Sequence, residues 1–106
     1  MGLPGGGGDG GAAYEGYWAL LRRRITETLV FPPMALRRGL RGTAQVALEI
    51  QPNGAISQVT LVSSSSHPML DEAAIDAVHS VGRVPFPAGL PPRRLRGEIP
   101  VVFDLR

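Results

Sequence analysis

The stretch "TAQVALEIQPNGAISQVTLV", residues 43–62, consists of two apolar segments separated by a turn signal. The first segment alternates between apolar and polar residues, which is the period of a half-buried β-strand. Its apolar face consists of Ala44, Val46, Leu48 and Ile50. Asn53-Gly54 favours a tight hairpin turn, because both residue types readily adopt positive φ. The stretch therefore predicts an antiparallel hairpin.

The second segment, residues 55–62, does not alternate regularly. Its large apolar residues are Ile56, Val59 and Leu61. The parity changes between the first and the second of these, and one extra residue in a strand, a β-bulge, produces such a change. We therefore expect a bulge near Ser57 or Gln58, which would place all three apolar side chains on the core face.

Two longer segments on either side of the hairpin have the three- and four-residue periodicity of amphipathic helices. In residues 15–30 the apolar stripe consists of Trp18, Leu21, Ile25 and Leu29. In residues 68–81 the stripe consists of Leu70, Ala73, Ala74, Ala77, Val78 and Val81. This second stripe is rich in alanine, which would let the helix lie close to a sheet.

Proline, serine and glycine mark the helix boundaries. Residues 33–38 are predicted to form a short helix, since proline suits the first helical position and Gly39 suits a left-handed cap. The later helix is expected to begin at Pro68, with Ser66 or His67 as its cap.

The chain closes with "EIPVVFDLR", residues 98–106, whose alternation predicts a third strand. Pro100 interrupts it, and proline has no N–H to donate to a neighbouring strand. We therefore expect an edge strand in which Pro100 faces the open side. The fold class that follows is α+β, with a small antiparallel three-stranded sheet and helices packed on one face.

The domain is expected to span residues 14–106. Residues 1–13 are rich in glycine and offer little to bury, which is typical of a flexible linker or a cloning remnant. No run of about 18 apolar residues is present, so we expect no membrane span in these 106 residues. An export signal or anchor would lie outside them.

No group of residues has the pattern of a catalytic or metal site. Ser63–Ser66 precede His67 but lack the G-x-S-x-G turn that exposes a catalytic serine. His67 and His79 have no third ligand at a suitable spacing, and there is no cysteine. Asp71, Glu72 and Asp76 have the pattern of a solvated helix face. We expect a binding or structural module without enzymatic activity, cofactor or metal.

Two arginine clusters remain, and each lies in a polar segment. The first consists of Arg37, Arg38 and Arg41, and the second of Arg93, Arg94 and Arg96. They are expected to be solvated surface residues; the alternative is a site for an anionic polymer. The net charge of +2 is small, and no aromatic residues lie between the arginines, so we expect no nucleic-acid partner.

Residues 31–62 resemble the C-terminal domain of TonB-family energy transducers. The matching positions are Phe31-Pro32, Ala35, Arg38, Gly39, Gly42, Val46, Asn53-Gly54, Val59, Leu61, Ser63 and Ser64. The resemblance continues through "LDEAAIDAV" at 70–78, Phe86-Pro87-Ala88 and the closing "IPVVFDL". Phe31 stands where the family usually has tyrosine, so any contact through that hydroxyl group is lost.

The resemblance implies a periplasmic domain of a Gram-negative bacterium, within a protein anchored in the inner membrane. It would bind the TonB box of outer-membrane transporters for ferric siderophores or vitamin B12. An upstream region would contact an ExbB/ExbD-like complex that supplies work from the proton gradient. A peptide would add to the closing strand, with contacts at Phe31, Pro32, Ile99, Val101, Val102, Phe103, Asp104 and Leu105. The alternative is a structural module that forms a homodimer through the same edge.

Overall fold

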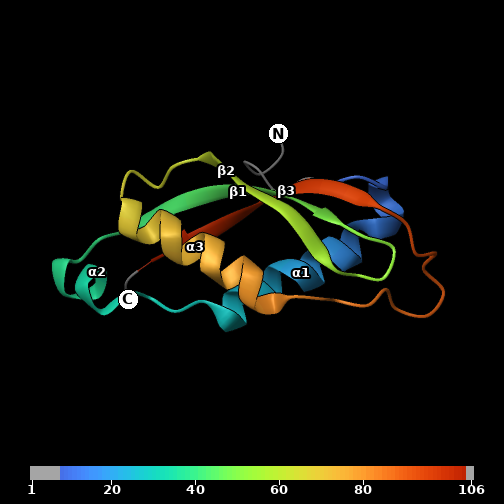
Figure 1. The fold of residues 1–106 in the computed structure, drawn as a ribbon, viewed down its shortest axis with the longest axis horizontal. Coiled ribbons are helices and arrows are strands. Elements are labelled where there is room, and N and C mark those ends of the chain that lie inside the picture. The colour runs from blue at the N-terminus through green and yellow to red at the C-terminus, as the bar shows by residue number, and fades with distance from the viewer. Residues whose placement is uncertain (1–7, 105–106) are drawn as a thin grey trace.

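The computed structural model describes residues 8–104, which form a three-stranded sheet with helices on one face (Figure 1). The elements are the 3-10 helix η1 (Gly11–Tyr14), α1 (Glu15–Thr28), α2 (Pro33–Arg38), β1 (Gly42–Ile50), β2 (Ile56–Ser63), α3 (Pro68–Val81) and β3 (Leu95–Phe103). Helices α1 and α3 run beneath the sheet in this view, and α2 lies at one end. The predicted α+β class is confirmed. Within the described residues, no helix has the length and apolarity needed to cross a bilayer.

The sheet has the order β2-β1-β3, and both neighbours of β1 run antiparallel to it. The predicted hairpin is confirmed as the β1–β2 connection, where Gly54 has a φ of 86°. Since β1 is central, β2 and β3 are the two edges of the sheet. The expectation that the proline-containing strand is an edge strand is therefore confirmed.

The predicted bulge in β2 is also present. The pairing register with β1 shifts between Ala47 and Glu49, and Gln58 lies in this interval with a φ of 53°. Leu61 then lies opposite the core residue Val46, so its side chain faces the helices. It nevertheless remains 41% exposed, contrary to the expectation of a core position. Ile56 and Val59, by contrast, are partly buried and pack against the core.

The core lies between the inner face of the sheet and the two long helices. The helices contribute the buried residues Tyr17, Trp18, Leu21, Ile25, Leu70, Ala74, Ala77 and Val78. The sheet contributes Ala44, Val46, Leu48, Ile50, Leu95, Ile99, Val101 and Phe103. The predicted apolar stripes therefore meet the predicted apolar strand faces. Helix α1 ends at Thr28, so Leu29 follows the helix and is only partly buried.

An aromatic cluster holds the proline-rich segment between α3 and β3. The ring of Phe86 stacks on Tyr17 with centroids 4.5 Å apart and meets the edge of Tyr14 at 6.2 Å. The Tyr17 hydroxyl donates to the carbonyl oxygen of Val84 at 2.6 Å, and the Tyr14 hydroxyl donates to that of Pro91 at 2.7 Å. Burial raises the pKa of Tyr17 to about 12, so the phenol is a neutral donor at neutral pH.

Helix α3 begins at Pro68, as predicted. His67 is the N-cap residue, but its side chain makes no capping hydrogen bond. Instead Asp71, in the first turn, accepts hydrogen bonds from the hydroxyls of Ser64 and Ser65 and from the N–H of Ser65. The helix thus uses its own carboxylate to bind the preceding loop. Ser66 is held at a φ of 78°, which prevents the backbone geometry of a normal cap.

Asp71→Asn should lower the free energy of unfolding at pH 7 by about 1–2 kcal/mol, because an amide satisfies fewer of these donors. Burial alone would raise the pKa of Asp71, but the hydrogen bonds from Ser64 and Ser65 and the charge of His67 outweigh it and lower the pKa. The carboxylate therefore stabilises the fold above its unfolded-state pKa of about 4, and this stabilisation disappears as the pH falls through the folded-state pKa.

Urea unfolding at pH 7 and at pH 2.5 measures this effect. The difference between the wild type and Asp71→Asn should shrink at the lower pH. Asp76→Asn is the matched control, since Asp76 is an exposed carboxylate on the same helix. Equal destabilisation by both variants, or a difference that does not change with pH, would contradict the assigned role of Asp71.

Candidate functional site

The free edge of β3 presents the backbone groups of every second residue. Arg96 faces outward, because its carbonyl oxygen accepts from the Asp9 N–H at 2.8 Å and its N–H donates to the Asp9 carboxylate at 2.9 Å. Residues of a strand direct their backbone groups alternately to the two sides. Glu98, Pro100 and Val102 therefore face the same free edge. The expectation for Pro100 is confirmed, and its missing N–H leaves the ladder with β1 intact.

The predicted contact residues on β3 fall into two groups. Three have buried side chains and backbone groups that face β1, namely Ile99, Val101 and Phe103. These three cannot offer hydrogen-bonding groups to an added strand. Val102 has both an outward backbone and a side chain that is 57% exposed. Asp104 is exposed just after the strand, and Leu105 lies outside the described residues. Among the predicted contact residues within β3, Val102 therefore combines an outward-facing backbone with an exposed side chain.

Phe31 and Pro32 lie on the helix side of the sheet. The Phe31 ring meets the ring of Phe103 edge to face, with centroids 5.6 Å apart. Because Phe103 belongs to the core, this contact places Phe31 beneath the end of β3. Pro32 instead lines a shallow pocket with Met69 and Ala73 of α3. Phe31 is therefore close to the predicted strand contact, whereas Pro32 turns toward another surface.

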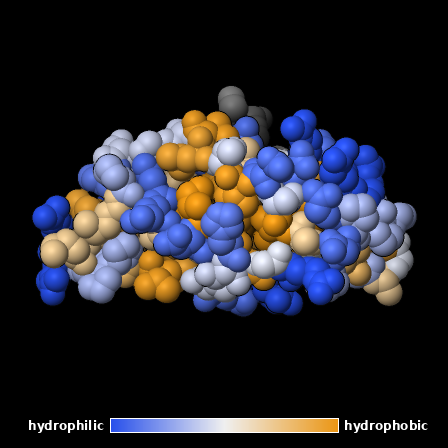
Figure 2. Space-filling model, viewed as in Figure 1, coloured by the Kyte–Doolittle hydropathy of each residue, from blue (hydrophilic) through white to orange (hydrophobic). Residues whose placement is uncertain are grey.

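The two arginine clusters lie at opposite ends of the sheet. Arg41 precedes β1 and forms an ion pair with Asp104 at 3.9 Å, while Arg96 pairs with Glu49 at 3.1 Å. The nine paired positions between these ends span about 26 Å at roughly 3.3 Å per residue. Figure 2 shows apolar surface gathered near the middle of the face drawn, with hydrophilic residues among it and toward both ends. Arg41 and Arg96 therefore lie too far apart along the sheet for the two clusters to form one basic patch.

Two residues of the expected linker, Gly8 and Asp9, contact strand β3. Gly8 bridges to Gly97, Asp9 binds Arg96, and the indole N–H of Trp18 donates to the Asp9 carbonyl oxygen at 3.0 Å. We call residues 8–10 the N-terminal clasp. The linker expected at residues 1–13 stays a prediction, although Gly8 and Asp9 make these specific contacts. Gly8 is required for this contact, because a Cβ at this position would lie 2.1 Å from the Trp18 ring.

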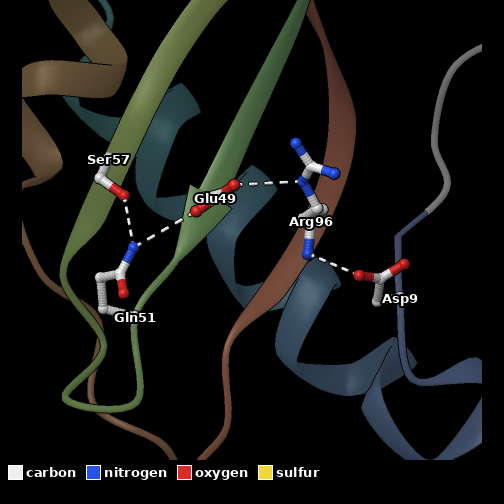
Figure 3. Close-up of polar contacts among 5 residues, drawn as sticks. All are labelled: Asp9, Glu49, Gln51, Ser57 and Arg96. Atoms are coloured by element: carbon white, nitrogen blue, oxygen red, sulfur yellow. Dashed lines mark hydrogen bonds and ion pairs between the residues drawn. The ribbon is translucent and has the colours of Figure 1, made fainter.

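A polar network continues from the clasp across the outer face of the sheet (Figure 3). The Glu49 carboxylate receives Arg96 on one side and the Gln51 amide at 3.4 Å on the other. The same amide donates to the Ser57 hydroxyl at 2.7 Å. Only 15% of the Glu49 side chain is exposed. Burying a carboxylate is costly unless it has a partner of opposite charge, and the ion pair with Arg96 provides one. The network joins all three strands and the clasp.

The serine and histidine residues do not form a catalytic arrangement. Asp71 binds Ser64 and Ser65 directly, and Ser65 donates to the backbone oxygen of His67 rather than to its ring. His67 and His79 lie near opposite ends of α3. Across residues 8–104, no three histidine, aspartate or glutamate side chains gather as metal ligands would.

Comparison with known proteins identifies relatives of this edge-and-helix architecture. Residues 27–105 match the family described as the Gram-negative bacterial TonB protein C-terminal. Protein TonB of Haemophilus ducreyi is 31% identical over 109 residues, which cover 99% of this chain and 38% of that protein. The chain therefore spans less than two-fifths of the length of that curated relative.

Solved structures give the same result for the fold. The C-terminal domain of Helicobacter pylori TonB superposes with a TM-score of 0.74 at 24% identity, over 87% of this chain and 83% of that one. TolAIII, solved bound to a peptide derived from the N-terminus of TolB, gives 0.56 at 28% identity, over 82% of this chain and 73% of that one. By the extent of the family match, this chain belongs to the family of the Gram-negative bacterial TonB protein C-terminal domain.

Proposed function

We propose that this domain is the partner-binding end of a TonB-type energy transducer and docks the TonB box of an outer-membrane transporter. The observation that carries the proposal is the free edge of β3 at Val102. The described residues provide no partner for the outward N–H and carbonyl groups of Val102. Such an edge accepts an additional strand without rearrangement of the sheet.

The geometry of the edge would limit the register of a docked peptide. The carbonyl groups of Pro100 and Val102 would accept hydrogen bonds from the peptide, and Val102 would donate one. Pro100 offers no donor, so the strongest pairing would be centred on Val102. Because backbone groups make these bonds, the edge would tolerate TonB boxes of different sequence. Phe31, which packs beneath the end of β3, would support this part of the edge.

The same edge is suited to transmitting force. A paired strand that is pulled along its length loads its hydrogen bonds together rather than one after another. The domain would act in the periplasm, at the end of a protein anchored in the inner membrane. An upstream region would contact an ExbB/ExbD-like complex and draw on the proton gradient. The transported substrates would be those of the partner receptor, such as ferric siderophores or vitamin B12. Binding and mechanical coupling, rather than catalysis, would be the domain's activity.

The peptide-bound structure of TolAIII supports the proposal, since that domain has a related fold and holds a peptide. An NMR titration with a synthetic TonB-box peptide tests it. The largest amide shift changes are expected at Val102 and its neighbours on β3, with smaller changes at Phe31. Changes centred on β2 or on α3 would contradict docking at this edge.

Self-pairing is the second candidate, because Val102 is an exposed apolar residue at an open edge. Two copies would then form a homodimer through β3, in competition with the peptide. Sedimentation velocity over a range of protein concentrations separates the two. A dimer that dissociates on addition of the peptide would indicate that both use one edge, and a monomer at every concentration would exclude self-pairing.

A further inference from the structure

The N-terminal clasp occupies the first outward-facing position of β3. Asp9 satisfies both backbone groups of Arg96, one through its own N–H at 2.8 Å and one through its carboxylate at 2.9 Å. Gly8 extends the contact by bridging to Gly97. A partner strand that paired along the whole edge would need these same two groups of Arg96.

The clasp itself does not continue along β3 as a regular paired strand. A further strand residue would offer its carbonyl to β3, but the Asp9 carbonyl is turned to the indole N–H of Trp18 at 3.0 Å. Gly10 then takes a φ of 97° and leads the chain away into η1. Trp18 is a core residue with 3% exposure, so this hydrogen bond joins the clasp to the core.

The contacts that hold the clasp are nevertheless suited to release. Gly8 and Asp9 are exposed to solvent, and glycine has the largest conformational freedom to regain. Exposed segments with few apolar contacts are the parts of a protein that open locally at low cost in free energy. The clasp therefore combines specific bonds with little buried surface.

We propose that residues 8–10 are an intramolecular competitor for the edge of β3, so that a docked peptide must either stop at Glu98 or displace Asp9 from Arg96. This inference rests on the proposed peptide docking for its binding consequence, whereas the clasp itself is testable without a peptide. A competitor that is closed most of the time lowers the apparent affinity by the fraction of open molecules. Releasing it should tighten peptide binding and lengthen the paired region toward Arg96.

Two variants of the full chain release the clasp in different ways. Asp9→Ala removes the carboxylate that receives the Arg96 N–H. Gly8→Ala places a Cβ 2.1 Å from the buried Trp18 ring and so displaces the segment while keeping Asp9. Asp9→Asn is the matched control, since its amide oxygen still accepts the hydrogen bond although the charge is lost. If charge rather than hydrogen bonding were decisive, Asp9→Asn would behave like Asp9→Ala.

Two readouts decide the proposal. Hydrogen exchange of the Arg96 amide, measured without peptide, should accelerate about tenfold or more in both releasing variants and stay near the wild-type rate in Asp9→Asn. The Kd of a synthetic TonB-box peptide, measured by calorimetry, should fall about three- to tenfold in the same two variants. Unchanged exchange at Arg96 would overturn the clasp. Faster exchange with an unchanged Kd would overturn the competition. Absence of binding to every protein would instead contradict the proposed function, and Arg96 exchange alone would then decide whether the clasp exists.

Discussion

Val102→Pro is expected to weaken binding of a TonB-box peptide by about 30-fold while the domain stays folded. The outward N–H of Val102 would be lost, and the peptide carbonyl facing it would be left without a donor, which together cost about 2 kcal/mol. The fold should tolerate the change, because the N–H of Val102 takes no part in the β1–β3 ladder and its side chain is largely exposed. Proline is accepted at such positions of an edge strand, as Pro100 already demonstrates.

The neighbouring residue supplies the control. Val101→Pro removes an N–H that faces β1 and lies in the core, so this variant should lose the cooperative fold. Calorimetric titration measures the peptide affinity, and circular dichroism reports whether each variant is folded. A folded Val102→Pro that binds the peptide like the wild type would exclude this N–H from the interface.

Gly54→Ala is expected to lower the free energy of unfolding by about 3 kcal/mol or more. Gly54 has a φ of 86°, which costs a residue with a Cβ about 1–2 kcal/mol. The added Cβ would also lie 2.4 Å from the carbonyl oxygen of Val84, a backbone atom that cannot move aside easily. Overpacking of this kind adds about 1–3 kcal/mol. The Val84 N–H donates to the Gly54 carbonyl at 2.9 Å, so a shift would also disturb that bond.

Gly89 provides a matched control for the backbone term. Its φ is 88°, but a Cβ there would meet nothing within 4 Å. Gly89→Ala should therefore cost only about 1 kcal/mol, and the difference between the two variants measures the clash with Val84. Urea unfolding followed by the fluorescence of Trp18, the single and buried tryptophan, gives both values. Equal losses in the two variants would show that the hairpin turn is not wedged against Val84.

Local patterns in the sequence predicted most of the secondary structure. The alternation over 43–51 corresponds to β1, and Asn53-Gly54 corresponds to the hairpin turn. The helical stripes correspond to the buried faces of α1 and α3. These features depend on residues a few positions apart, so the sequence displays them directly. The parity change in β2 also predicted the position of a bulge. In a strand that alternates strictly, Ile56 and Val59 would point to opposite faces of the sheet, so an extra residue is needed to bury both.

Contacts between distant parts of the chain were not predictable in this way. Tyr17 and Val84 are 67 residues apart, and Asp9 and Arg96 are 87 apart. No periodicity links such pairs, so the sequence shows neither the contact of Asp9 with Arg96 nor the aromatic cluster. His67 is the N-cap of α3, one of the two residues predicted, but the hydrogen bonds that Asp71 accepts from Ser64 and Ser65 have no such local signal.

The contact residues expected on the closing strand stay a prediction, but the structure separates them by the direction of their backbone groups. The position of Pro100 in the sequence is enough to make this separation. If its position faces the open edge, then Val102 faces the edge as well, whereas Ile99, Val101 and Phe103 must face β1. The sequence alone did not show that β3 pairs with β1. This pairing determines which backbone groups of β3 already have a hydrogen-bond partner.

Amide hydrogen exchange at Val102 tests strand addition at this edge most directly. With a saturating TonB-box peptide, the exchange rate of the Val102 amide should fall at least tenfold, because its N–H would enter a new hydrogen bond. The Val101 amide, which already faces β1, should change little beyond any general stabilisation of the domain. Peptide binding that leaves Val102 exchange unchanged, or that protects both amides equally, would contradict docking by strand addition on β3.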